Sequence, residues 1–110
     1  MKLTIVDRIA FLGVLPEKGS NVDNNVVVKL REKVDFKIDE ITSAEIKQEN
    51  GMIIWKDDSP LATEGVEFEF EPYEFNLVKK ALDKLDSEGE LSLKDGTNGL
   101  YNKFVEAVVV

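Results

Sequence analysis

The sequence predicts an α+β domain in which three strands lie together in the middle of the chain, with helices on either side. Near both ends, apolar residues recur every three or four positions, which is typical of helices that bury one face. In the middle, an Asn50-Gly51 pair separates two strand-like segments, and an alternating segment follows them. Helices and strands that are segregated along the chain favour α+β over an alternating parallel fold.

Two helices are predicted in the first third of the chain. The first covers 3–14, where Thr4 can cap the free backbone amides of the first turn. The second covers 21–34 and follows Ser20, another capping residue. Within it, the valine run 26–28 is typical of strands, so a buried strand is the alternative for this segment.

A hairpin is predicted after a connector that contains one short helical turn at 39–42. Asn-Gly suits a two-residue type I′ turn because both residues tolerate positive φ. This turn pairs 44–49 with 52–57 and sets Glu49 opposite Met52. The face expected to meet the core has Ile46, Ile53 and Trp55, with Trp55 as its largest apolar contributor, and the opposite face has Met52 and Ile54.

The third strand is predicted at 65–71, where apolar and acidic residues alternate, and it is expected to join the hairpin. Pro72 suits the first turn of a following helix, and Gly89 suits its C-terminal cap. A last helix begins at 97–98, and the tail at 108–110 either frays or docks as a strand. The order is therefore α-α-β-β-β-α-α, with the helices packed on one face of a three-stranded antiparallel sheet.

The composition indicates one domain over 1–110 and excludes several kinds of site. The chain has 110 residues, 14 Lys and Arg against 22 Asp and Glu, and neither Cys nor His. A disulfide framework, a zinc–thiolate site, a Cys nucleophile and a His-based triad are therefore excluded. The net charge of −8 disfavours direct nucleic-acid binding. Because no apolar stretch approaches the roughly 18 residues that span a bilayer, we expect a cytoplasmic protein without membrane contact.

The motifs of catalysis and cofactor binding are also missing from the sequence. The segment 96–99 has two glycines but lacks the lysine of a phosphate-binding loop. The acidic residues around Asp57 and Asp58 lack the alternating ligand spacing of a calcium-binding loop. We therefore expect no metal, no cofactor and no enzyme activity, and a carboxylate-dependent enzyme is the weakest of three alternatives.

Three segments carry a resemblance. They are D-R-I-A-F-L-G-V-L-P-E-K-G at 7–19, L-V-K-K-A-L-D-K-L-D-S-E-G-E-L at 77–91 and L-Y-N-K-F at 100–104. In this order they resemble a group of small, uncharacterised proteins encoded in tailed bacteriophages and prophages. The region 41–65 has no part of that pattern. The resemblance implies a phage or prophage accessory protein in a bacterial host cell, and it implies no activity and no functional residues.

Two further hypotheses concern function through binding. The first is a non-catalytic protein-interaction module that binds a protein partner or a second copy of itself. Its candidate surface consists of Met52 and Ile54, on the hairpin face without a predicted cover, together with Tyr73 and Tyr101.

The second hypothesis is an acidic inhibitor that imitates nucleic acid and occupies the groove of a host protein. Glu67, Glu69 and Glu71 alternate along one strand, so their side chains would lie about 6.6–7 Å apart on one face. That spacing resembles the spacing of successive phosphates on a nucleic-acid strand. The simpler interpretation is a solvated strand face whose like charges deter aggregation.

Overall fold

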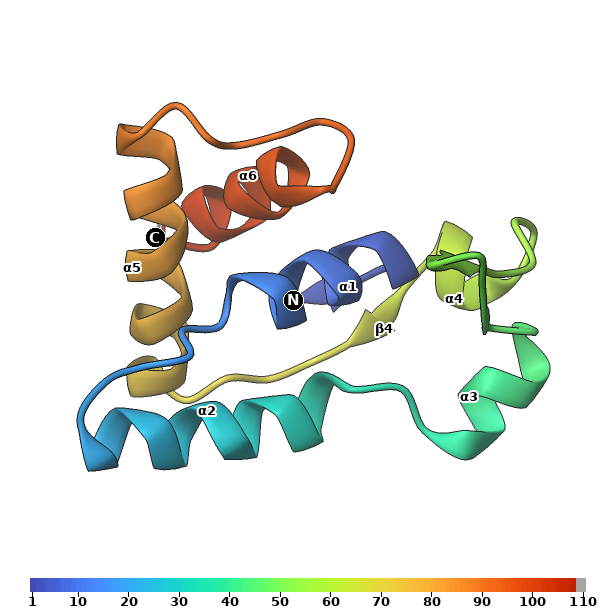
Figure 1. Ribbon diagram of the computed structural model, residues 1–110, viewed down its shortest axis with the longest axis horizontal. Helices are drawn as coiled ribbons and strands as arrows, with labels where there is room; N and C mark the ends of the chain where they lie inside the picture. Colours follow the sequence, from blue (N-terminus) through green and yellow to red (C-terminus); the bar gives the residue numbers. More distant parts are fainter. Residues whose placement is uncertain (109–110) are drawn as a thin grey trace.

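The computed structural model describes residues 1–108, so Val109 and Val110 of the predicted tail lie outside the described residues. Helices dominate this part of the chain, and the strands are short (Figure 1). The elements are β1 (Lys2–Leu3), α1 (Ile5–Val14), α2 (Asn21–Val34), α3 (Ile38–Ser43), β2 (Lys47–Glu49), β3 (Met52–Ile54), α4 (Pro60–Thr63), β4 (Val66–Glu67), α5 (Pro72–Ser87) and α6 (Thr97–Val108).

The predicted N-terminal helices are confirmed, except that the first begins at Ile5 and not at residue 3, because Lys2–Leu3 pair as β1 with β4. Local capping explains where both helices begin. The backbone N–H of Asp7 donates to Thr4 Oγ1 over 3.2 Å, and the backbone N–H of Thr4 donates back to Asp7 Oδ2 over 2.9 Å. At the second helix, the N–H of Asp23 donates to Ser20 Oγ over 3.1 Å. Each cap satisfies amides that the first turn of a helix leaves without a partner. The strand alternative for residues 26–28 is therefore wrong.

The hydrophobic core lies between helices rather than between helices and a sheet. Helices α1, α5 and α6 contact one another, and α2 contacts α1 and α5. The aromatic rings of Phe11 and Phe104 lie at the centre, with Phe75 stacked on Phe104 at 4.8 Å between ring centroids. The buried apolar residues of this cluster are Leu3, Ala10, Phe11, Leu15, Val27, Leu30, Val34, Val78, Leu82, Leu100 and Phe104.

The predicted three-stranded sheet is wrong. Residues 1–108 form two separate two-stranded sheets, β1 with β4 and β2 with β3. Strand β4 pairs antiparallel with β1, with Leu3 opposite Val66, and the Phe68 N–H extends this pairing to the Met1 carbonyl. Phe68 and Phe70 pack against the helical core, and their burial holds this segment there rather than beside the hairpin. Only residues 66–67 are regular strand, although the alternation of half-buried and exposed residues continues to Glu71.

The predicted hairpin register is confirmed, but the strands cover only Lys47–Glu49 and Met52–Ile54 of the predicted 44–49 and 52–57. The predicted role of the hairpin face is wrong. Glu49 pairs with Met52 and Lys47 pairs with Ile54, around a turn in which both residues have positive φ. The face expected in the core stays outside it, because Ile53 is 39% exposed and Trp55 is only half-buried. Trp55 is therefore not part of the hydrophobic core.

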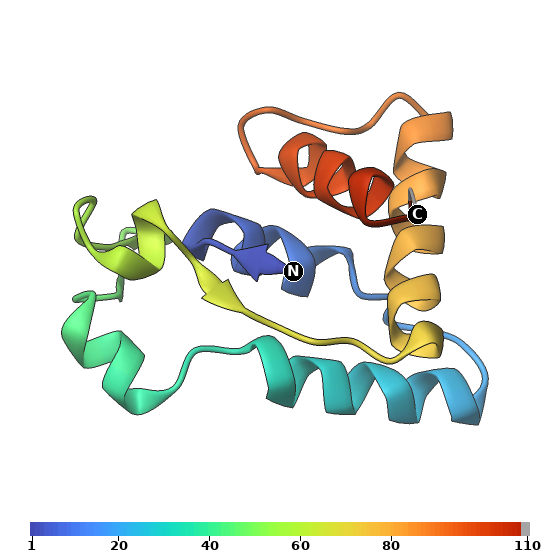
Figure 2. The same cartoon turned by 180° about the vertical axis from the view of Figure 1, so that it is seen from behind.

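The molecule divides into two regions. The helical body comprises α1, α2, α5 and α6 with the β1–β4 pair, and the extension comprises residues 38–64 with α3, the hairpin and α4. In two opposite views, α3 and α4 lie at the end of the molecule away from α5 (Figures 1 and 2). Within the extension, only Ala44 and Ser59 are buried.

The predicted C-terminal helices are confirmed. Pro72 occupies the first turn of α5, and Gly89 follows the end of that helix with a φ of +68°. This left-handed conformation is typical of the glycine that ends a helix. Within the described part of the chain, no helix has the length and apolar character needed to cross a lipid bilayer.

Candidate functional site

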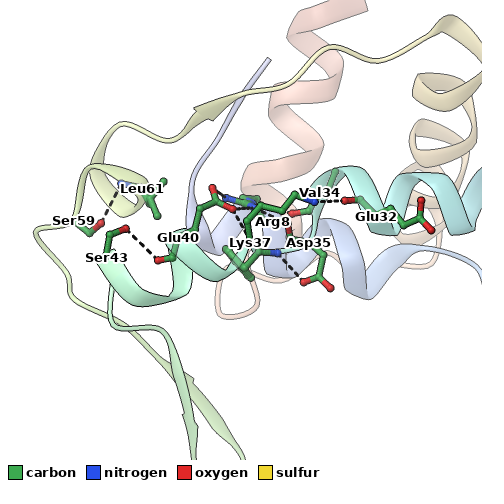
Figure 3. A network of polar contacts seen from close by, with 10 residues as sticks. Arg8, Glu32, Val34, Asp35, Lys37, Glu40, Ser43, Ser59 and Leu61 are labelled. Carbon is green, nitrogen blue, oxygen red and sulfur yellow. Dashed lines mark hydrogen bonds and ion pairs between the residues drawn. The ribbon is translucent and has the colours of Figure 1, made fainter.

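The hairpin is the most exposed apolar feature among the predicted site residues. The side chain of Met52 is 66% exposed, Ile53 is 39% exposed and Ile54 is half-buried. The chain segments that lead into and out of the hairpin run away from the helices (Figure 3). The hairpin therefore presents an apolar strand at the periphery of the molecule.

Two other apolar side chains of the extension are also exposed. On α3, Ile38 is 85% exposed and Ile41 is 40% exposed. Exposed apolar residues scattered singly are normal in soluble proteins, but several in one region mark interaction surfaces.

A buried arginine joins the extension to the helical body (Figure 3). The side chain of Arg8 on α1 is 1% exposed. Its guanidinium donates to both carboxylate oxygens of Glu40 on α3, over 2.8 and 2.9 Å. It also donates to the carbonyls of Val34 and Asp35, over 2.9 and 3.0 Å. Because these contacts use donors on all three guanidinium nitrogens, Arg8 determines where α3 begins relative to α1.

Aromatic rings and a lowered pKa complete this arginine site. The guanidinium carbon lies 4.2 Å from the ring centroid of Phe36 and 5.1 Å from that of Phe68. The hydrogen bond from Arg8 holds the pKa of the Glu40 carboxyl below its ordinary value, although burial opposes this effect. The Glu40 carboxyl therefore stays ionised at neutral pH, and its ion pair with Arg8 supports the extension as a structural contact.

A second ion pair, with a neighbouring backbone contact, holds the glutamate-rich segment 66–71 and the start of α5 against α2. The Lys33 ammonium lies 2.7 Å from Glu74 Oε1, and it also donates to the Glu69 carbonyl over 3.1 Å. Burial alone would raise the pKa of Glu74, but hydrogen bonds from Lys33 and from the Glu71 N–H keep it below its ordinary value. Glu74 is thus a buried structural carboxylate at the start of α5.

The three glutamates of the acidic hypothesis are all exposed, along the extended segment 66–71. Glu67 forms an ion pair of 2.6 Å with the Met1 amino group. The hydrogen bond from this ammonium holds the pKa of Glu67 below its ordinary value. Part of the negative charge along the row is therefore compensated within the chain.

The predicted partner-surface residues do not lie together. Met52 and Ile54 belong to the extension, whereas Tyr73 lies near the start of α5 and is 55% exposed. Tyr101 is half-buried on α6, and its hydroxyl donates to Asp86 over 3.3 Å. Burial and the neighbouring Asp86 carboxylate raise the pKa of Tyr101.

Tyr73 lines a broad groove of the helical body, with a volume of about 1560 Å³. The groove lies between α1, the start of α2, α5 and the segment before α6. Apolar side chains such as Ile9, Val22 and Leu77 face it, and lysines and carboxylates are mixed along its rim. This lining offers contacts for an apolar protein segment.

Among the described residues, no three His, Cys, Asp or Glu side chains are grouped so that they could hold a metal ion.

Sequence reasoning missed Arg8, Glu40 and Ile53. A signal for Arg8 was present, because it lies three residues after Ile5 and three before Phe11, on the buried face of α1. A charge at such a position requires a partner, and Glu40 is 32 residues away.

Comparison with family models, with curated proteins and with solved structures found no match for this chain.

Proposed function

We propose that this protein is a small, non-catalytic protein-interaction module that docks through its hairpin, and that it serves as an accessory protein of a phage or prophage in the bacterial cytoplasm. The observation that supports docking is the exposed apolar strand β3, in which Met52 is 66% exposed. The phage context rests on the resemblance of segments 7–19, 77–91 and 100–104.

The construction of the extension supports this proposal. Its apolar side chains contribute little to the core, since only Ala44 and Ser59 are buried between residues 38 and 64. The Arg8–Glu40 pair nevertheless holds the extension in a defined place on the body. A surface that is apolar, exposed and fixed in position pays little ordering entropy when it binds, which favours specific docking.

Site-specific photo-crosslinking in a bacterial host tests the docking proposal. A photoreactive amino acid replaces Met52, and in a matched control it replaces Leu93, which is 86% exposed outside the extension. We expect discrete protein adducts from position 52 that are absent from position 93. Equal adducts from both positions, or none from position 52, would contradict docking through the hairpin.

The acidic inhibitor is a second proposal, favoured by the exposure of Glu67, Glu69 and Glu71 along one extended segment. A Glu→Gln variant at all three positions should lose salt-sensitive binding to a host nucleic-acid enzyme, because binding of this kind depends on charge. A triple Glu→Gln variant at the exposed positions Glu17, Glu32 and Glu106 is the matched control. Unchanged binding by the first variant rejects this proposal.

A further inference from the structure

We propose that two copies of this chain pair through the outer edge of β3 and form a four-stranded antiparallel sheet across a two-fold axis. This inference rests on the proposed function, because it names the occupant of the docking hairpin. It requires a free strand edge, side chains that match their own copies, and a local charge that allows two acidic chains to meet.

The free edge follows from the register of the hairpin. Glu49 and Met52 flank the two-residue turn and form a hydrogen-bonded pair, so the next pair, Gln48 with Ile53, is not hydrogen-bonded. The peptide N–H and C=O of Ile53 therefore point away from β2, along the outer edge of β3. A strand with such groups free can pair with another strand.

The side chains of β3 match their own copies. Antiparallel pairing about Ile53 places Ile53 opposite Ile53 of the second copy, and Met52 opposite Ile54 of the second copy. One face of the sheet then gathers two Met52 and two Ile54 side chains, which bury surface that is exposed in the single chain. In the same register, Trp55 lies opposite Gly51 of the second copy, which has no side chain to obstruct it.

Charge distinguishes the two edges of the hairpin. Strand β2 has the exposed residues Lys47, Gln48 and Glu49, and charges on an edge deter pairing. Strand β3 has no charged residue. Residues 47–54, the two strands and their turn, carry one lysine and one glutamate, whereas the whole chain carries a net charge of −8. Two chains can therefore meet at the hairpin without a local excess of negative charge, and added salt should favour pairing by screening the acidic bodies.

The paired strands are short, so the dimer is reversible and depends on concentration. Stable interfaces bury about 1,200–2,000 Å², and two three-residue strands bury less. Disulfide cross-linking, which captures a short-lived dimer covalently, is therefore the appropriate measurement. The chain has no cysteine, so Ile53→Cys introduces a single thiol. In the proposed register, the two Cα atoms at position 53 are about 5.5 Å apart, within the range that a disulfide spans.

Gln48→Cys is the matched control, because it lies on the same hairpin face but on the opposite edge. In the proposed dimer the two copies of position 48 are separated by three strand spacings, about 14 Å, which a disulfide cannot span. We expect Ile53→Cys to form disulfide dimers about tenfold faster than Gln48→Cys in a concentrated, oxidised sample. Adding Met52→Lys to Ile53→Cys should abolish this advantage, whereas adding Leu93→Lys should preserve it.

The outcomes separate this inference from the proposed function. Equal cross-linking of the two cysteine variants overturns pairing through β3, and faster cross-linking of Gln48→Cys assigns pairing to the β2 edge, which also overturns it. If pairing fails while the photoreactive residue at position 52 joins a different protein, hairpin docking stands and only the second copy is rejected. If neither experiment gives an adduct, both proposals fail.

Discussion

The helical body and the extension use apolar residues in opposite ways. In the body, α1, α5 and α6 enclose Phe11, Leu82 and Phe104, none of which is exposed to solvent. In the extension, Met52 and Ile38 are largely exposed, and the position of α3 depends on the charged contact between Arg8 and Glu40. A chain of this size can therefore build its core from little more than four helices and leave other apolar residues outside that core.

Removal of the arginine should have the largest effect, because it breaks the contact between the two regions. Arg8→Ala leaves two backbone carbonyls without this donor, and the Glu40 carboxylate keeps the Lys37 N–H as its donor but loses the guanidinium. We expect a loss of about 3–5 kcal/mol in the free energy of unfolding, measured by urea denaturation. Arg8→Lys keeps the charge but not the two-pronged geometry, so it should recover only part of the loss. If Arg8→Ala lowers the free energy of unfolding by less than about 1 kcal/mol, the contact is dispensable for stability.

Truncating one apolar side chain in each region tests whether the two regions contribute differently to the free energy of unfolding. Leu82→Ala removes a fully buried side chain from the body and should cost about 2–5 kcal/mol. Ile53→Ala removes a side chain that is 39% exposed and should cost less than about 1 kcal/mol. Thermal and urea unfolding measure both values. Equal costs would mean that the extension contributes to the core as much as the body does.

The junction between the extension and β4 depends on a glycine. Gly65 has a φ of +82°, and a Cβ added there would lie 2.8 Å from the Leu3 carbonyl oxygen. Gly89 has a φ of +68° but open space around it, so Gly89→Ala should cost only the backbone term of about 1 kcal/mol. We expect Gly65→Ala to cost clearly more in urea denaturation. Similar costs at both positions would contradict the close approach of residue 65 to β1.

Acid should weaken the Arg8–Glu40 pair, which joins α1 to α3, and the Lys33–Glu74 pair, which joins α2 to α5. The pKa values of Glu40 and Glu74 are lowered from an ordinary value of 4.5, so the unfolded chain binds their protons more readily than the folded chain does. The stability that these carboxylates contribute is therefore complete above about pH 4.5 and is lost as the pH falls through their lowered pKa values. Thermal unfolding between about pH 7 and pH 3 measures this loss. Glu74→Gln should reduce the slope, and Glu17→Gln, at an exposed position, should leave it unchanged.

Local signals allowed much of the fold to be predicted, and long-range contacts account for the errors. Thr4 and Ser20 mark helix starts within three residues of their bonding partners, and the Asn-Gly turn fixes its own register. The partner of β4 is β1, more than 60 residues away, and no local pattern in either segment identifies the other. The exposure of Met52 agrees with the uncovered hairpin face that the alternation predicted. The exposure of Ile53 follows from the position of the core between the helices of the body, away from the hairpin, which no local pattern indicates.

The guanidinium of Arg8 also has a mechanical consequence. It contacts Glu40 on α3 and the carbonyls of Val34 and Asp35 at the end of α2, so a force applied to the hairpin reaches α1 through this side chain as well as through the contact between α4 and α1. With that side chain in place, the extension is held to α1 at two points, α3 and α4. Without it, the extension keeps the α4 contact with α1 but loses the link through α3.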